Sequence, residues 1–248
     1  MDSAVPALFS KIDQVVMRIG IDVRCLVLGK RTGVEEYALA LLGSIFERDR
    51  ENEYVLFYNA WRKRTLDFSW ATKYPNVTIR SFRFPNKLFN LCLWYFRYPK
   101  LDRLIGGVDV FFAPNLNFIS VSKQARLIVT AHDLSFEYFP ETFSLKQRLW
   151  HYLVNFRGLA VRADRIIAVS ASTKDDLISF YGLSADKITV VQSGIGNRFS
   201  VFDLPRIPVL LVPSLSRLLQ LIALPAPLSP LPLAAIALRR RETAFDAG

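Results

Sequence analysis

Short apolar runs alternate with amphipathic segments between residues 17 and 200. In Arg18–Arg24, the side chains of Ile19, Ile21 and Val23 fall on one face of a predicted strand, because successive side chains of a strand point to opposite faces. Further strands are predicted over Tyr54–Tyr58, Val77–Phe82, Val108–Phe112, Arg126–Ala131, Arg165–Ser170 and Lys187–Gln192.

The segments between these strands carry helix start and stop signals. The N-terminal capping pairs are Thr32 with Glu35, Ser144 with Gln147 and Ser172 with Asp175. The second helix is predicted to extend to about Ala163, and the third to end at Gly182. Strands that alternate with helices predict an α/β fold with a Rossmann-like, mainly parallel sheet and helices on both faces.

The two ends of the chain depart from this pattern. Residues 1–16 fit no element, and we expect them to form an N-terminal extension to a domain at 17–199. Residues 201–248 hold seven of the thirteen prolines. A membrane span at 218–238 would contain four of these prolines, and each costs about 3 kcal/mol inside a helix. We therefore expect an irregular Leu/Pro-rich tail at 200–248, with a membrane span as the alternative.

Composition narrows the classes of function. The chain has 248 residues, of which 51% are hydrophobic, so it can bury a substantial core. Its 32 basic and 22 acidic residues give a net charge of +10, which favours anionic partners such as phosphates or an acidic membrane surface. Cys25 and Cys92 provide neither a disulfide framework nor a zinc set, so we expect no metal and a reducing, cytoplasmic location.

The stretch 68–101 contains no acidic residue and interleaves basic with aromatic side chains. The residues expected to contact an anionic membrane surface or a protein partner are Arg80, Arg83, Lys87, Trp94, Arg97 and Lys100. The structural alternative is a helix that packs on the core and exposes a solvated basic face. The pattern would also suit single-stranded nucleic acid, although we do not expect a nucleic-acid partner.

In a parallel α/β sheet, ligands bind beyond the carboxyl ends of the strands. The candidate binding residues at those positions are Gly29, Gly33, Asn115, Asn117, His132, Asp133, Ser170, Thr173 and Gly194. Each also has a purely structural interpretation. The glycines suit tight turns or, at Gly194, a hinge with positive φ. The serine and threonine suit a helix cap, and a lone histidine is often held by a carboxylate or a carbonyl.

Three segments carry a resemblance to a known family. They are RIGIDVRCL…RTGVEEYALALL (18–42), HDLSFEYFPETFS (132–144) and RADRIIAVSASTKDDLISFYGLSADKITVVQSGI (162–195). They resemble the N-terminal, acceptor-side domain of family 4-type glycosyltransferases, which forms one half of the GT-B fold, over about residues 17–199. Family members continue into a second Rossmann-like domain with a Glu-x7-Glu motif, and no two glutamates here have that spacing. The chain resembles a member truncated or frameshifted after about residue 199.

The resemblance implies retaining transfer of a glycosyl group from a nucleoside diphosphate sugar to a hydroxyl acceptor, such as a polysaccharide or glycolipid intermediate. It implies no cofactor and no established protein nucleophile, because the donor phosphate takes the acceptor proton. Gly29 and Gly33 would approach the donor diphosphate in a loop that leads into a helix N-terminus.

The resemblance also suggests roles for the polar residues. His132 would contact the transferred sugar or the acceptor. Asp133 would orient the imidazole of His132 or bind an acceptor hydroxyl, and Asn115 and Asn117 would line the acceptor cleft. Without a donor domain, we expect no efficient transfer by this chain alone.

Two further hypotheses stay open. The first is a non-enzymatic module, peripheral at the inner face of a membrane, that binds an anionic surface or a protein partner through 68–101. The second is a truncated product without a selected function.

Overall fold

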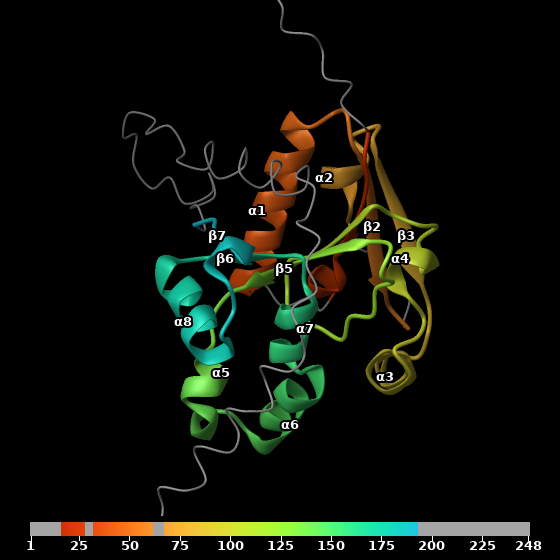
Figure 1. Cartoon of the computed structure of the whole chain (residues 1–248). Coiled ribbons are helices and arrows are strands. Elements are labelled where there is room, and N and C mark those ends of the chain that lie inside the picture. The colour runs from red at the N-terminus through yellow and green to blue at the C-terminus, as the bar shows by residue number, and fades with distance from the viewer. Residues whose placement is uncertain (1–15, 28–31, 62–66, 193–248) are drawn as a thin grey trace, which may run out of the picture.

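The computed structural model describes residues 16–27, 32–61 and 67–192. Seven strands form one sheet (Figure 1). They are β1 (Arg18–Asp22), β2 (Glu53–Asn59), β3 (Val77–Phe82), β4 (Val110–Ala113), β5 (Arg126–Ala131), β6 (Arg165–Ala168) and β7 (Ile188–Val190). The order is β3-β2-β1-β4-β5-β6-β7 and every pairing is parallel, which confirms the predicted Rossmann-like sheet.

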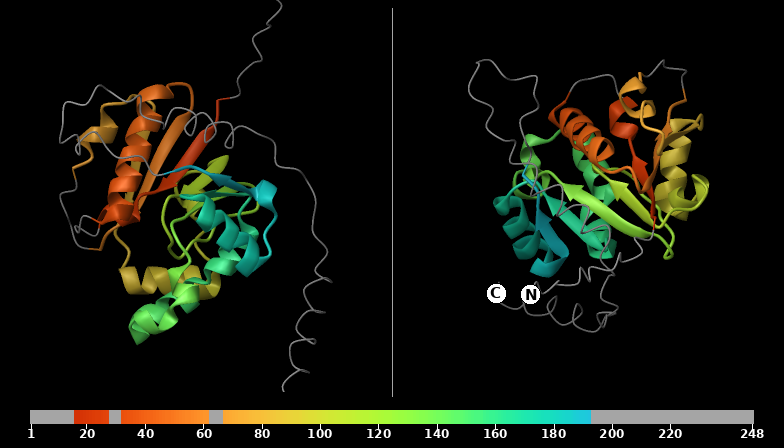
Figure 2. Two further views of the ribbon diagram at one scale, coloured as in Figure 1. Left: turned by 90° about the vertical axis from the view of Figure 1, so that its left-hand side faces the viewer. Right: turned by 90° about the horizontal axis from the view of Figure 1, so that it is seen from above.

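Helices cover both faces of this sheet (Figures 1 and 2). They are α1 (Gly33–Arg48), α2 (Ser69–Thr72), α3 (Asn86–Leu91), α4 (Leu101–Leu104), α5 (Ser135–Tyr138), α6 (Leu145–Val154), α7 (Phe156–Arg162) and α8 (Ala171–Tyr181). A π-helix (Cys92–Phe96) continues directly from α3. None of the helices among the described residues is long and apolar enough to cross a membrane.

The strands contribute to two hydrophobic cores, one on each face of the sheet, because successive side chains point to opposite faces. On one face, Ile19, Ile21, Leu56 and Phe112 pack with the apolar side of α1 and with α2. On the opposite face, the neighbouring strand positions pack with α3, α4, α7 and α8. Strands β2, β4 and β5 are buried on both faces because both faces are covered, as expected for a parallel sheet, whereas the edge strand β3 is partly exposed.

Gly20 of β1 marks a close approach between the sheet and the segment after α4. A Cβ atom at this position would lie 2.6 Å from the Cδ1 atom of Ile105. The absence of a side chain at Gly20 therefore lets Ile105 pack directly on the central strand.

The capping pairs are confirmed at two of the three predicted helix starts. Thr32 with Glu35 and Ser144 with Gln147 each form a complete capping box. The third prediction is wrong, because Ser170 caps α8 in place of Ser172, and its Oγ atom accepts a hydrogen bond from the Thr173 N–H. Ser170 has the extended backbone of a cap (φ −151°, ψ 165°), whereas Ser172 lies inside the helix.

The single helix predicted from Ser144 to about Ala163 is also wrong. The segment forms α6 and α7, separated by Asn155 in the left-handed conformation (φ 50°, ψ 66°). Asparagine adopts this conformation more readily than most residues. The Oδ1 atom of Asn155 then accepts a hydrogen bond from the Gly158 N–H at 3.0 Å and caps α7.

Candidate functional site

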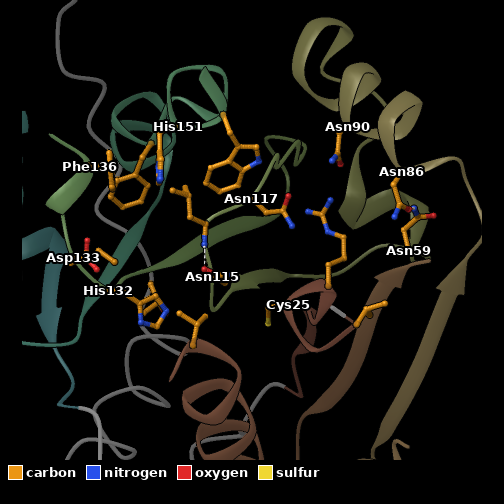
Figure 3. A pocket seen from close by; sticks show the side chains of 18 of the residues that line it. Cys25, Asn59, Asn86, Asn90, Asn115, Asn117, His132, Asp133, Phe136 and His151 are labelled. Carbon is orange, nitrogen blue, oxygen red and sulfur yellow. Dashed lines mark hydrogen bonds between the residues drawn. The ribbon is translucent and has the colours of Figure 1, made fainter. Parts of the chain in front are cut away.

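The strand order reverses between β1 and β4, and a cavity of about 510 Å³ opens at the carboxyl ends of the strands there (Figure 3). Its walls come from the residues after β1, β2, β4 and β5 and from α3, α5, α6 and α7. Such a reversal is where parallel α/β sheets bind ligands, because the loops that leave the two central strands diverge. Of the predicted site residues, the cavity brings together Asn115, Asn117, His132 and Asp133.

His132 follows β5, and its ring is fixed in orientation. The Nε2 atom lies 2.9 Å from the carbonyl oxygen of Pro114, which can only accept a hydrogen bond, so Nε2 carries the proton. The ring of Tyr37 meets it edge-on, with centroids 5.0 Å apart. Burial lowers the pKa of His132, so the ring is neutral near pH 7 and its Nδ1 atom offers a lone pair.

Asp133 does not orient this ring. Its Oδ1 atom accepts hydrogen bonds from the N–H and the hydroxyl of Ser135 at 2.9 and 2.5 Å, at the start of α5. The carbonyl of Pro114 fills the orienting role that we expected for Asp133. Asp133 is exposed at the cavity wall, so contact with an acceptor hydroxyl is the role that its position allows.

Asn115 and Asn117 lie in the loop after β4. Each Oδ1 atom accepts a hydrogen bond from the next residue's N–H, at 2.7 Å for Asn115 and 2.8 Å for Asn117. This contact fixes the amide and leaves its Nδ2 group as the donor. Among the described residues, no acceptor is hydrogen-bonded to either Nδ2 group, so both can donate to a ligand.

Three buried polar atoms of the cavity-lining residues have no hydrogen-bond partner in the described part of the chain. They are Nη1 of Arg24, Oγ1 of Thr130 and Nδ1 of His151. Buried polar groups are nearly always satisfied in folded proteins, and each exception needs an explanation. These atoms have almost no surface exposed to the cavity, so a ligand with hydroxyl groups, which both donate and accept hydrogen bonds, reaches them only if neighbouring side chains move.

Arg24 is buried and paired, although an arginine side chain is usually exposed to solvent. Its guanidinium binds both carboxylate oxygens of Asp22, with Nη2 2.6 Å from Oδ2 and Nε 2.9 Å from Oδ1. The Nη2 group also donates to the carbonyl of Phe118 at 2.9 Å. Because Asp22 neutralises Arg24, this arginine adds no net charge to the cavity.

The cavity contains one thiol, that of Cys25, and its environment makes it unreactive. Burial, together with the nearby Asp22 and Glu35, raises the pKa of Cys25 to about 12. A thiol with this pKa is protonated at neutral pH, and the thiolate is the nucleophilic form. Cys25 is therefore no candidate for covalent catalysis.

Aromatic side chains form a wall that the sequence did not predict. Phe136 of α5 stacks on His151 of α6 with ring centroids 4.4 Å apart, and Trp150 meets the same imidazole edge-on at 4.9 Å. Phe156 of α7 completes this side of the cavity. The break at Asn155 brings α6 and α7 to the same wall, and this break was not predicted.

Asn59, Asn86 and Asn90 also line the cavity without having been predicted. Figure 3 shows Asn59 and Asn86 at the end opposite His132. The Nδ2 group of Asn59 donates to Oδ1 of Asn86 at 2.8 Å, which joins the end of β2 to the start of α3. Asn59 comes directly after the predicted strand Tyr54–Tyr58 and is the last residue of β2, and this position was a signal that could have found it.

The other predicted ligand residues lie elsewhere. Ser170 and Thr173 do not line the cavity; they fix the start of α8, and the Thr173 hydroxyl donates to the carbonyl of His132 at 3.3 Å. Gly33 is exposed at the first position of α1, and a Cβ atom there would meet nothing within 4 Å. Gly29, Gly194 and the segments 1–15 and 200–248 lie outside the described residues.

The stretch 68–101 is not one helix, since it runs from before α2 through β3, α3 and the π-helix to the start of α4. Arg80, Arg83, Lys87 and Arg97 are exposed, and Trp94 and Lys100 are half-buried. The described residues contain no cluster of three side chains that could hold a metal ion.

Lowering the pH should destabilise the folded chain, because the two histidines that line the cavity become protonated more readily in the unfolded chain. Both histidines of the chain line the cavity, and burial lowers the pKa of each below its ordinary value of 6.5. The unfolded chain then binds protons more tightly than the folded chain, so stability is complete above pH 6.5 and declines as the pH falls below it.

Urea unfolding at pH 7.5, 6.5 and 5.5 tests this expectation. The urea midpoint should fall between the last two values and fall less in the double variant His132→Gln/His151→Gln, which cannot titrate there. The pKa of Asp49 is also lowered, but its effect on stability falls in a separate pH range, around and below the ordinary value of 3.8. An equal fall in both proteins would contradict the assignment to the histidines.

Comparison with known proteins places this geometry in context. Residues 31–196 match the family described as glycosyltransferase family 4. The crystal structure of Anabaena Alr3699/HepE in complex with UDP and glucose is 17% identical, with a TM-score of 0.42, over 72% of this chain and 45% of that one. The wall teichoic acid polymerase TagF is 11% identical, with a TM-score of 0.38, over 71% of this chain and 38% of that one. The chain thus spans less than half the length of either structure. No curated protein matches it significantly.

Proposed function

Because the chain belongs to glycosyltransferase family 4, we propose that it is the acceptor-side half of a retaining enzyme that transfers a hexosyl group. The donor is a nucleoside diphosphate sugar and the acceptor is a hydroxyl group held in the cavity. The acceptor oxygen bonds to the anomeric carbon, the bond from that carbon to the diphosphate breaks, and a diphosphate oxygen takes the hydroxyl proton. No metal or cofactor enters this reaction.

The observation that carries the proposal is the set of unsatisfied polar groups in a cavity without net positive charge. Nη1 of Arg24 and the Nδ2 groups of Asn115 and Asn117 are donors, Nδ1 of His132 is an acceptor, and the Thr130 hydroxyl is both. A sugar ring presents hydroxyl groups that match such a mixed set. The aromatic faces of Trp150 and Phe136 supply an apolar wall for the C–H face of the ring.

The polar residues bind and position the acceptor in this proposal, and none forms a covalent intermediate. The neutral His132 accepts a hydrogen bond from a sugar hydroxyl through Nδ1, because Nε2 is committed to Pro114. Holding the reacting hydroxyl in one orientation lowers the entropic part of the barrier. In this proposal the donor diphosphate approaches the N-terminus of α1 at Gly33, because the first N–H groups of a helix attract anions.

The substitution Thr130→Val tests saccharide binding separately from the stability of the fold. The Thr130 hydroxyl is buried, and the Tyr37 hydroxyl is its nearest polar neighbour, without hydrogen-bond geometry between them, so Thr130→Val should change the free energy of unfolding by less than about 1 kcal/mol. The same change should weaken saccharide binding severalfold, because a ligand hydrogen bond is lost. Titration of the labelled chain with a panel of saccharides, followed by NMR at the His132 ring and the Asn115 and Asn117 amides, measures the binding.

The matched control is Thr78→Val, on the edge strand β3, where the side chain is exposed. It should alter neither the NMR shifts nor the affinity. If Thr130→Val and the original chain bind saccharides equally well, the proposal that the cavity binds the acceptor is contradicted. Transfer is then assayed with nucleoside diphosphate sugars and the best-binding saccharide as acceptor.

A second candidate function is contact with an anionic membrane surface. Leu88 and Leu91 of α3, Tyr95 and Phe96 of the π-helix, and Tyr98 are all exposed, next to the basic residues of 68–101. Such apolar side chains with basic neighbours favour an anionic lipid interface. Co-sedimentation with phosphatidylglycerol vesicles should be strong at low salt and decline at high salt. No pelleting at low salt would exclude this function.

A further inference from the structure

A second cavity of about 310 Å³ lies between the π-helix, the loop 117–121 and the junction of α6 with α7. It shares only the wall residue Asn117 with the first cavity among the residues that line the two. Its volume is at the lower end of the range for small-ligand sites. The proposed glycosyl transfer assigns it no role.

Three cations line this second cavity: Arg97, Lys100 and Arg162. None of the described residues that line it is acidic, and no described carboxylate forms an ion pair with any of the three. Asp102 is the acid that attracts Lys100, but its two oxygens accept hydrogen bonds from the N–H and the hydroxyl of Ser122 at 2.7 and 2.5 Å. The positive charge of the cavity is therefore uncompensated by a direct partner.

Hydrogen bonds hold the side chains of two of the cations, Lys100 and Arg162. Nζ of Lys100 donates to the Ser120 hydroxyl at 3.1 Å, and that hydroxyl donates to the carbonyl of Arg97 at 2.5 Å. Nη2 of Arg162 donates to the carbonyls of Val121 and Ser122 at 3.2 and 2.8 Å. Lys100 and Arg162 keep further N–H groups that these contacts do not use, so the cavity presents donors that are already ordered. The exposed guanidinium of Arg97 adds the third cation.

The environment strengthens an interaction with an anion. Trp94, Leu93 and Leu153 form apolar walls of the cavity beside the half-buried Lys100, which lowers the local dielectric constant there and strengthens its charge interactions. Arg97 and Arg162 are more exposed. Desolvation and the positive charge of Arg162 lower the pKa of Lys100. The same repulsion among like charges would be relieved by a bound anion.

We propose that this second cavity is a phosphate-binding site built by Arg97, Lys100 and Arg162. A phosphate group suits it because several oxygens of one tetrahedral anion can accept charge-assisted hydrogen bonds from three cations. The phosphate belongs either to a lipid headgroup or to a soluble phosphate ester. The charge of the cavity does not distinguish these two sources. Tyr95, Phe96 and Tyr98, which lie next to the cavity, are exposed and could contact a lipid surface.

The test compares two double variants of the full chain that remove the same charge. Arg97→Gln/Lys100→Met removes two cations from the cavity. Arg103→Gln/Lys123→Met removes two exposed cations that do not line it. Inorganic phosphate and pyrophosphate are titrated into each labelled protein and followed by NMR, and urea midpoints confirm that each protein is folded.

We expect saturable binding by the original chain and by the Arg103/Lys123 control. Binding should be at least about tenfold weaker in the Arg97/Lys100 variant, since hydrogen bonds to charged groups contribute that factor or more. Absence of saturable binding by the original chain, or equal weakening in both double variants, would overturn the proposal. Asn117 lines both cavities, so phosphate binding is followed at the signals of Arg97, Lys100 and Arg162, and saccharide binding at those of His132 and Asn115. The two proposals can then fail independently.

A vesicle experiment distinguishes the two sources of phosphate. Co-sedimentation with phosphatidylglycerol vesicles that is weakened only in the Arg97/Lys100 variant, and competed by pyrophosphate, supports a lipid headgroup. Saturable pyrophosphate binding with vesicle binding equal in both double variants supports a soluble phosphate ester.

Discussion

Replacing Asp22 with asparagine should lower the free energy of unfolding by about 3–5 kcal/mol. The carboxylate of Asp22 accepts hydrogen bonds from Nε, Nη2 and the backbone N–H of Arg24. The side chains of Arg24 and Asp22 are only 8% and 4% exposed, so the variant leaves a buried guanidinium without its countercharge. Urea denaturation of the two proteins measures the difference.

An exposed ion pair between β1 and β2 supplies the control for this experiment. Arg18 and Glu53 form an ion pair with N···O 3.7 Å, but their side chains are 33% and 64% exposed. Exposed pairs contribute little, so Glu53→Gln should change the free energy of unfolding by less than about 1 kcal/mol. Equal effects of the two substitutions would show that burial does not determine the strength of the Asp22–Arg24 pair.

The second large effect is expected from Phe111→Ala in β4, with a loss of about 3–5 kcal/mol. Phe111 is fully buried, at 0% exposure, on the sheet face covered by α3, α4, α7 and α8. Its removal loses the burial of the ring and leaves a cavity between the sheet and this layer, which can collapse only in part. The urea midpoint should fall while the slope of the transition stays unchanged.

Tyr152→Ala in α6 is the matched aromatic truncation, since Tyr152 is 80% exposed. Substitutions at such positions change stability by about 0.5 kcal/mol or less. A similar loss in both variants would mean that the face of the sheet around Phe111 is not tightly packed.

Local patterns in the sequence predicted the elements well. The alternation around Ile19 and Ile21 and the capping pair of Thr32 with Glu35 depend on residues close together in the chain. The break at Asn155 was missed because apolar residues recur at helical spacing on both sides of it, at Leu149, Leu153, Phe156 and Ala160. The left-handed turn is stabilised by a single side-chain contact to Gly158. Such spacing predicts helical structure, but it does not show whether the residues belong to one helix or to two.

The site was predicted only in part, for a related reason. His132, Asp133, Asn115 and Asn117 follow strands, and the rule for parallel sheets found them. Trp150 and His151 lie in the middle of α6, and only the packing of that helix brings them to the cavity. The burial of Arg24 depends on Asp22 and on the carbonyl of Phe118, 94 residues away in sequence, a contact that no local pattern encodes.

The order of the strands also has a consequence for synthesis on the ribosome. β1 pairs with β2 on one side, but its other partner is β4, where Ile19 lies opposite Val110. Until β4 has emerged, β1 has an unpaired edge, and the space at Gly20 is not yet filled by Ile105. The cavity between β1 and β4 cannot be complete in a nascent chain that ends before Phe156, so ligand binding should appear well after the β1–β2 pair can already exist.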